Sequence, residues 1–213
     1  MQTIARQGRD FIARHGETVF NAARRVQGDH LHTPLTRAGF AQADAIGQAL
    51  RAELGPRPAL TLWASPTGRA LQTLAVIAEH LELDWHVART DARLVEIGTG
   101  RWGGRYHADL IAEVGAVFDS ATGAMRVAPE GEDYAAIAER VTGWLTDTQE
   151  DSRDRLVVMH GMSSRVLRGV MTGLPVEPSL GAPFAPGLAQ GSIVAVEDGR
   201  ERVLHHGAGR APA

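Results

Sequence analysis

The chain has 213 residues, of which 44% are hydrophobic, 22% charged and 5% aromatic. These values are typical of one soluble globular domain and exclude disordered and collagen-like chains. The formal net charge of −3 provides no basic field for a polyanion, so we expect no nucleic-acid partner. The sequence has no cysteine, which excludes disulfides, thiolate metal sites and a cysteine nucleophile.

Membrane association and export lack support in the sequence. No stretch approaches the roughly 20 apolar residues that span a bilayer. Residues 1–10 contain no apolar segment typical of an export signal. We therefore expect a cytoplasmic protein with no membrane partner.

The first predicted elements are a strand and a long helix. The strand covers residues 10–14 and runs into a turn at Gly16. Thr36 is placed to cap the helix, which ends at Gly55-Pro56. Its predicted buried face consists of Phe40, Ala43, Ile46, Leu50 and Leu54.

A second strand is predicted over residues 59–64 and a second helix directly after it. Ser65-Pro66 predicts the start of this helix, because serine is a favoured cap and proline is favoured at the first helical position. Its predicted buried face consists of Leu71, Leu74, Ala78 and Leu81. Residues 97–130 are the least regular part of the chain, and we expect them to form a lid-like insertion over the sheet.

A third long helix is predicted to start at Glu132 or Asp133. Its predicted buried face consists of Ile137, Val141 and Leu145. A fully apolar strand over residues 156–159 follows, and His160-Gly161 leads directly into another helix.

The C-terminal part combines a loop with a hairpin. Residues 173–191 are rich in glycine and proline and are predicted as loop. Asp198-Gly199 separates two predicted strands, 192–196 and 202–205, and is a typical hairpin signal. The alternation along the chain predicts an α/β fold, a three-layer sandwich with a mostly parallel sheet flanked by helices and some antiparallel strand near the C-terminus. We expect residues 1–213 to form a single domain.

Polar clusters follow three of the predicted strands. They are Arg14-His15-Gly16-Glu17-Thr18, Ser65-Pro66-Thr67-Gly68-Arg69 and His160-Gly161. Because the carboxyl ends of parallel strands form the ligand crevice of such a sheet, two arginines and two histidines are expected to converge there. Guanidinium groups and helix N-termini match the oxygens of a phosphoryl group.

These residues resemble the histidine phosphatase superfamily, also called phosphoglycerate mutase-like, over nearly the whole chain. Its R-H-G-E-T hallmark stands at residues 14–18. The further matching positions are Asn21, Arg25, Gln27 and Gly28 of N-x-x-x-R-x-Q-G, Pro34-Leu35-Thr36, Ser65 to Ala70 of S-P-x-x-R-A, Leu94-Val95-Glu96 with Gly100 and Trp102, Pro129 to Glu132, and His160-Gly161 with Arg165. An ordered set of this length is far more specific than R-H-G alone.

The resemblance implies a phosphohistidine mechanism that needs neither metal nor cofactor. His15 is then the nucleophile, and Arg14, Arg69 and His160 hold the phosphoryl oxygens. Glu96 is the implied general acid and base. The remaining substrate-contact candidates are Asn21, Gln27, Thr18 and Gly161.

Several alternatives remain open at this stage. Glu113, Glu130 and Glu132 compete with Glu96 for the role of the acid. Arg25 and Arg165 are interpreted as structural ion-pair partners. A dinucleotide-type glycine pattern at 98–103, a partial nucleophile elbow at 161–165 and two histidine pairs, at 30 and 32 and at 205–206, lack the context that would make them sites.

The expected activity is hydrolysis of a small phosphomonoester, with two alternatives. The first is phosphoglycerate mutase-type transfer, which the short segment after the acid disfavours, although Arg101 and Arg105 remain available for an acidic substrate. The second is a non-catalytic phosphate-binding or interaction module. A nicotinamide-dependent enzyme is a more remote hypothesis. A homodimer is common among proteins of this family.

Overall fold

The structure is a computed structural model that describes residues 6–209. Residues 1–5, part of the stretch from which we predict no export signal, and 210–213, the end of the predicted domain, lie outside this range. Within it, no helix is both long and apolar enough to cross a membrane.

A central six-stranded sheet has the strand order β3-β2-β4-β1-β7-β8. The strands are β1 (Asp10–Arg14), β2 (Leu60–Ala64), β3 (Arg89–Thr90), β4 (Asp154–Met159), β7 (Ile193–Glu197) and β8 (Arg200–His205). The first four are parallel, whereas β7 runs antiparallel to both β1 and β8. The predicted α/β class and the antiparallel C-terminal hairpin are therefore confirmed.

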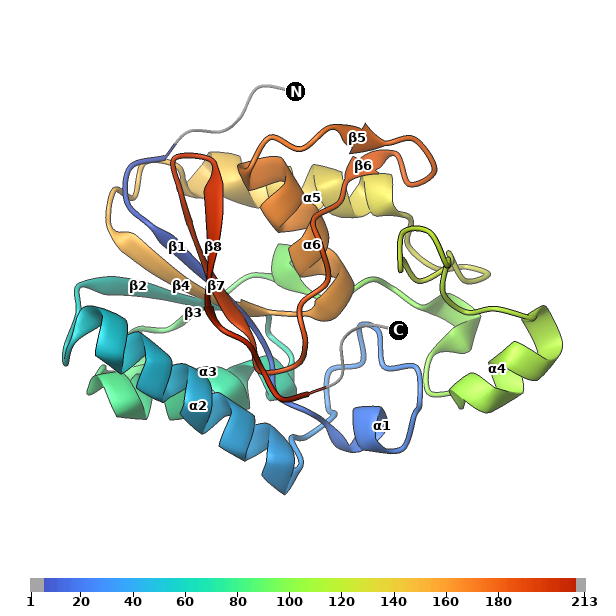
Figure 1. Ribbon diagram of the computed structural model, residues 1–213, viewed down its shortest axis with the longest axis horizontal. Coiled ribbons are helices and arrows are strands. Elements are labelled where there is room, and N and C mark those ends of the chain that lie inside the picture. Colours follow the sequence, from blue (N-terminus) through green and yellow to red (C-terminus); the bar gives the residue numbers. More distant parts are fainter. Residues whose placement is uncertain (1–5, 210–213) are drawn as a thin grey trace.

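Helices cover both faces of the sheet (Figure 1). The pair α2 (Arg37–Leu54) and α3 (Gly68–Leu81) lies on one face, and α5 (Tyr134–Thr148) and α6 (Gly161–Met171) lie on the other. Alternate strand residues feed two separate cores. On β1, Phe11 and Ala13 pack on the side of α2 and α3, and Ile12 packs on the side of α5 and α6. Burial on both faces explains why Phe11 to Ala13 in β1 and Leu156 to Met159 in β4 are all apolar.

Side chains predicted as helix caps act as such at two helices. Thr36 accepts a hydrogen bond from the Gly39 N–H at 3.0 Å at the start of α2. Asp133 accepts one from Ala136 at the start of α5, which decides between the two predicted starts.

Two helix predictions need correction. Helix α3 begins at Gly68 with Thr67 as its cap, because the Ser65 N–H still bonds to the Val158 carbonyl and prolongs the sheet by one residue. In the first turn of α2, Gly39 rather than Phe40 faces inward. A Cβ on Gly39 would lie only 2.1 Å from the Glu17 carbonyl, whereas Phe40 is 40% exposed.

Two segments predicted as irregular contain short elements. The 97–130 segment includes α4 (His107–Val114) and a 3-10 turn (Gly100–Trp102). The 173–191 segment includes the two-residue strands β5 (Val176–Glu177) and β6 (Ala182–Pro183), which pair with each other. The remaining short elements are α1 (Val19–Ala22) and the 3-10 turns Trp85–Val87 and Ala92–Leu94.

Candidate active site

The register of the two central strands brings two histidines together. Arg14, the last residue of β1, lies opposite Met159, the last residue of β4. His15 and His160 follow these residues, and their ring centroids are 5.2 Å apart in an edge-to-face arrangement. Both side chains are buried, with exposed fractions of 2% and 0%. Strand pairing therefore fixes the histidine pair at the carboxyl edge of the sheet.

The His15 ring is held in one tautomer. Its Nδ1 lies 2.7 Å from the Gly16 carbonyl oxygen, which can only accept, so Nδ1 carries the proton of the neutral ring. Burial, together with the charges of Arg69 and Arg14, lowers the pKa of His15 well below its ordinary value of 6.5. At pH 7 the imidazole is neutral, and its Nε2 bears a free lone pair.

The His160 ring is held in the opposite tautomer. Nε of Arg69 donates a hydrogen bond to Nδ1 of His160 at 3.2 Å, so the ring proton is on Nε2. This Nε2 is buried and has no partner among the described residues. Burial and then Arg69 lower the pKa of His160 well below 6.5. The second histidine therefore has an unsatisfied N–H donor on a ring that neighbours the ring of the first.

Arg69 is committed mainly to holding other protein groups. Its Nη1 donates to the His30 carbonyl at 2.6 Å and to the Thr33 hydroxyl at 3.0 Å, and its Nη2 donates to the Gly28 carbonyl at 2.6 Å. With the bond to His160, four of the five guanidinium N–H groups are used. The sequence predicts that the guanidinium fork of Arg69 is open toward phosphate. Within residues 6–209, one Nη2 donor of Arg69 remains without a partner.

Arg14 lies directly beside the histidine pair and keeps donors free. Its Nη1 bonds to the Leu188 carbonyl, while its buried Nε has no partner within residues 6–209. Its guanidinium packs against Gly161, where a Cβ would lie 3.2 Å from Arg14 Nη2. Burial lowers the pKa of Arg14 to about 10, so the side chain stays charged at pH 7.

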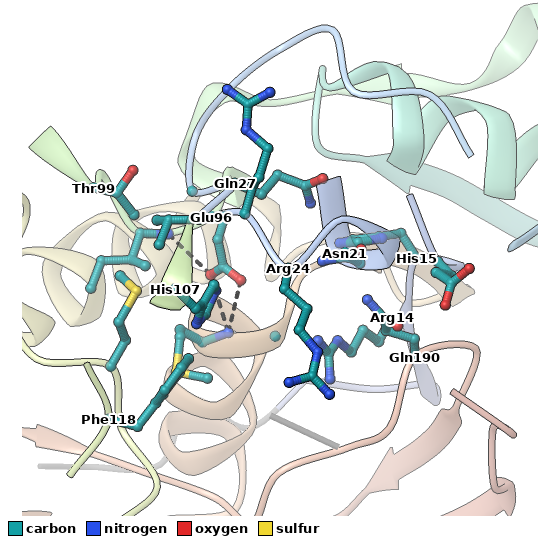
Figure 2. A pocket seen from close by; sticks show the side chains of 18 of the residues that line it. Arg14, His15, Asn21, Arg24, Gln27, Glu96, Thr99, His107, Phe118 and Gln190 are labelled. Atoms are coloured by element: carbon teal, nitrogen blue, oxygen red, sulfur yellow. Dashed lines mark hydrogen bonds between the residues drawn. The ribbon is translucent and has the colours of Figure 1, made fainter. Parts of the chain in front are cut away.

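The carboxylate of Glu96 lies at the N-terminus of α6. It accepts hydrogen bonds from the backbone N–H groups of Met162 at 3.0 Å and Ser163 at 2.8 Å. The bonds between Glu96 and Met162 are among the dashed lines in Figure 2. The positive end of a helix favours an anion at this position. Glu96 lines the same cavity as Arg14 and His15.

The three competing glutamates lie elsewhere. Glu113, Glu130 and Glu132 form ion pairs with Arg105, Arg101 and Arg140, respectively, and none of them lines the cavity. Glu96 is therefore the one of the four candidate acids that lies beside the histidine nucleophile candidate.

Hydrogen bonds link three of the predicted substrate-contact residues, Thr18, Asn21 and Gln27. Thr18 caps α1, and its N–H donates to Asn21 Oδ1 at 3.1 Å. Its hydroxyl also contacts Gln27 Oε1. Thr18 is fully buried and does not line the cavity, whereas Asn21 and Gln27 do. Thr18 thus positions the other two residues.

Arg25 and Arg165 hold the structure through carbonyl groups, so their predicted ion pairs are wrong. Nε of Arg25 donates to the Gly104 carbonyl at 2.6 Å. Arg165 donates to the carbonyls of Ala185, Gly123 and Thr122 at 2.7, 3.0 and 2.7 Å. Neither arginine forms an ion pair in the part of the chain that the structure describes.

The site opens into a cavity of about 410 Å³. In Figure 2, His15 and Arg14 lie on one side of the view, and Phe118 and Thr99 lie on the other. Several lining residues are not among the predicted site residues: Glu17, Arg24, His107, Phe118 and Gln190. The last three come from segments without a periodic pattern, so no local signal marked them.

The described part of the chain holds no group of three His, Asp or Glu side chains arranged to bind a metal ion. The hydrogen-bond donors gathered around the histidine pair include guanidinium groups and one helix N-terminus. Such donors bind phosphoryl oxygens in other proteins.

Comparison with known proteins decides the family. The protein-family model described as histidine phosphatase superfamily (branch 1) matches residues 11–208 of this chain. The chain belongs to this superfamily. A relative named "Probable phosphoglycerate mutase GpmB", from Yersinia enterocolitica, is 34% identical over 170 residues, which cover 78% of this chain and 75% of the relative.

Solved structures with this superfamily fold include several phosphatases. A mycobacterial glucosyl-3-phosphoglycerate phosphatase in complex with VO3 has a TM-score of 0.73 and 28% identity, covering 97% of this chain and 100% of the other. YhfR from Bacillus stearothermophilus has a TM-score of 0.71 and 26% identity, covering 92% and 95%. The α-ribazole phosphatase from Shigella flexneri, at 23% identity and a TM-score of 0.72, covers 95% and 100% and shows the shared fold.

Proposed function

We propose that this histidine phosphatase superfamily member is a phosphomonoester hydrolase that works through a phosphohistidine and without a metal ion. The observation that carries the proposal is the pair of opposite tautomers. His15 offers a lone pair at Nε2, and the neighbouring His160 offers an unpartnered Nε2–H. One group attacks phosphorus, and the other binds the charge on its oxygens.

In the first step, Nε2 of His15 forms a bond to phosphorus as the bond to the ester oxygen breaks. Arg14, the Nε2–H of His160 and the one free Nη2 donor of Arg69 bind the phosphoryl oxygens. The Gly161 N–H, at the start of α6, is the proposed backbone donor. Asn21 and Gln27 contact the substrate from the cavity wall.

Glu96 is the proposed proton donor and acceptor. Its carboxylate takes the proton of the phosphate monoester monoanion and passes it to the leaving alkoxide in the first step, and the same carboxylate takes a proton from water in the second. The water oxygen then bonds to phosphorus, and the bond to His15 breaks to release phosphate. The hydrogen bonds from α6 hold this carboxylate beside the cavity.

Hydrolysis is favoured over mutase-type transfer by the placement of two arginines. Arg101 pairs with Glu130, and Arg105 pairs with Glu113 at 2.6 Å. Both guanidinium groups are engaged by glutamates outside the cavity, so neither is free to bind the carboxylate of a phosphoglycerate.

The test is phosphate release from p-nitrophenyl phosphate, ethyl phosphate and 3-phosphoglycerate in the presence of EDTA. We expect release by the wild-type chain and a loss of at least about a thousandfold in His15→Ala, because the nucleophile is removed. His86→Ala, which changes an exposed histidine, is the matched control. Activity that disappears with EDTA and returns with a metal ion would contradict the metal-free mechanism.

Two other outcomes would replace the proposal. Conversion of 3-phosphoglycerate into its isomer without phosphate release would establish a mutase. Binding of inorganic phosphate with no turnover of any ester would establish a phosphate-binding module.

A further inference from the structure

The cavity has far more room than a phosphoryl group needs. Its volume of about 410 Å³ falls in the range of pockets that enclose whole small ligands. His15 and Arg14 lie together at one part of its wall. The rest of the cavity must then receive the group that the phosphate esterifies.

Six apolar residues contribute to the lining of the cavity: Val26, Ile97, Ile111, Phe118, Met125 and Met162, which we call the apolar wall. In Figure 2, Phe118 lies on the side of the view opposite His15. Four of these side chains are buried, whereas Ile111 is 51% exposed and Phe118 is partly buried. When an apolar ligand group covers exposed or half-buried apolar side chains around a cavity, the free energy of the complex is lowered.

The apolar wall is held in place before any ligand binds. Phe118 and Met125 pair across an antiparallel bridge, which belongs to a hairpin over residues 117–126. The Tyr134 hydroxyl donates to the Met125 carbonyl at 2.8 Å, and Arg165 donates to carbonyls in the turn of the hairpin. The Phe118 ring also stacks on His107, with centroids 5.7 Å apart and planes inclined by 13°. A preformed wall costs little ordering entropy on binding.

Few of the charged groups that line the cavity are cations free to bind an acidic alcohol, because Arg14 and Glu96 belong to the proposed phosphoryl site and Glu17 is an acid. Burial and the charge of Arg24 lower the pKa of His107 below 6.5, so its ring is neutral at pH 7. Arg25 is occupied by the Gly104 carbonyl and by the rings of Phe20 and Tyr106. Arg24 is left as the cation that an acidic leaving group would have to use.

We propose that the substrates of this site are phosphomonoesters whose alcohol carries an apolar chain or ring, and that the apolar wall selects them. This inference rests on the proposed function, since it concerns the same cavity. Polar, acidic alcohols gain nothing from the wall and are the poorer substrates.

The decisive experiment uses a series of primary alkyl phosphates: ethyl, butyl and hexyl. Their leaving groups have nearly the same basicity, so differences in kcat/KM report contacts and not chemistry. We expect kcat/KM to rise up to about fourfold for each methylene that the wall buries. Binding of the matching alkylphosphonates, which are not hydrolysed, is measured by calorimetry and should follow the same order.

Two variants distinguish an effect of the apolar wall from a general effect of substitution. Phe118→Ala should lower kcat/KM for hexyl phosphate about tenfold more than for ethyl phosphate, because a large part of the wall is removed. Val114→Ala, on α4 and outside the cavity lining, is the control and should leave the series unchanged.

Three results would overturn the inference. Equal kcat/KM across the alkyl series, with ethyl phosphate hydrolysed, refutes it and leaves the proposed function intact. A preference for 3-phosphoglycerate over hexyl phosphate that disappears in Arg24→Ala shows that the site selects acidic alcohols. If no ester is hydrolysed, the proposed function fails, and alkylphosphonate affinities that do not rise with chain length refute the apolar preference separately.

Discussion

The guanidinium Nε of Arg69 donates a hydrogen bond to Nδ1 of His160 at 3.2 Å, and this contact fixes which nitrogen of the second histidine carries the proton. The same guanidinium bonds to Gly28, His30 and Thr33. One side chain therefore fixes the tautomer of a site histidine and also holds the loop that borders the cavity.

The tautomer of His160 can be observed directly. Nitrogen-15 NMR of wild-type protein at pH 7.5 should show protonated Nε2 and unprotonated Nδ1 in His160, and the reverse in His15. Arg69→Lys removes the donor to Nδ1, and kcat should fall at least about tenfold because the His160 ring is no longer held. Arg37→Lys, on the exposed first turn of α2, is the control. A protonated Nδ1 in wild-type His160 would refute the arrangement.

Gly161→Ala should reduce activity without reducing stability. The new Cβ would lie 3.2 Å from Arg14 Nη2, so the guanidinium must move from its position beside His15. We expect kcat/KM to fall about tenfold, since displacements below 1 Å are costly in oriented sites. The melting temperature should not fall, because alanine is the better helix former. Gly143→Ala in α5, where a Cβ meets only an ordinary 3.7 Å contact, is the matched control. Full activity in Gly161→Ala would show that Arg14 does not depend on this contact.

Stability should decline below pH 6.5 because two buried histidines must stay neutral. In the folded chain the pKa values of His15 and His160 lie well below 6.5, whereas in the unfolded chain they return to about 6.5. The unfolded state therefore binds more protons as the pH falls, and the stabilisation present above pH 6.5 is lost. Each histidine contributes a slope of up to about 1.4 kcal/mol per pH unit. Urea unfolding at pH 7.5, 6.5 and 5.5 measures it.

The histidine variants provide the control for that slope. His160→Gln should remove about half of the slope, whereas a change at the exposed His86 should leave it unaltered. A slope that persists in the double variant of His15 and His160 would mean that other groups cause it.

Arg165 should prove necessary for the position of the 117–126 hairpin. Its guanidinium joins α6 to the carbonyls of Thr122 and Gly123 and to Ala185. Arg165→Met keeps the aliphatic stem but removes these donors, and we expect a loss of about 2 kcal/mol in the free energy of unfolding. Thermolysin should cut the hairpin faster than in wild type. The control is Arg126→Met at an exposed position, and equal cleavage rates in the two variants would contradict the role.

The role of Glu96 can be tested through leaving-group basicity. Glu96→Gln cannot donate a proton, so ethyl phosphate hydrolysis should fall by about 10²- to 10⁴-fold. p-Nitrophenolate leaves without a proton, so this substrate should give a rapid burst followed by slow release of phosphate from His15. Glu113→Gln, outside the cavity, should behave as wild type. Equal losses for both substrates, with no burst, would refute the role as acid.

The sequence by itself determined the class of fold and the position of both histidines in it. The patterns over 10–14 and 156–159 predict strands, and both become central strands of the sheet. Periodicity reports local burial, and a polar cluster directly after a buried strand must lie at the edge of the sheet. This reasoning and the order of the motifs are enough to predict His15, Arg14, His160 and Glu96 as site residues.

Only the tertiary structure decided what each polar group bonds to. The partners of Arg69 lie 36 to 91 residues away along the chain, and no local pattern encodes such contacts. The start of α3 also differed from expectation, because a sheet hydrogen bond at Ser65 outweighed the local signal for a helix cap. The apolar wall comes from five separate segments, and hydrogen bonds from Arg165 on α6 and Tyr134 on α5 hold the hairpin that carries two of its residues. Local spacing reports which residues are buried, whereas the choice among many buried partners depends on packing between distant parts of the chain.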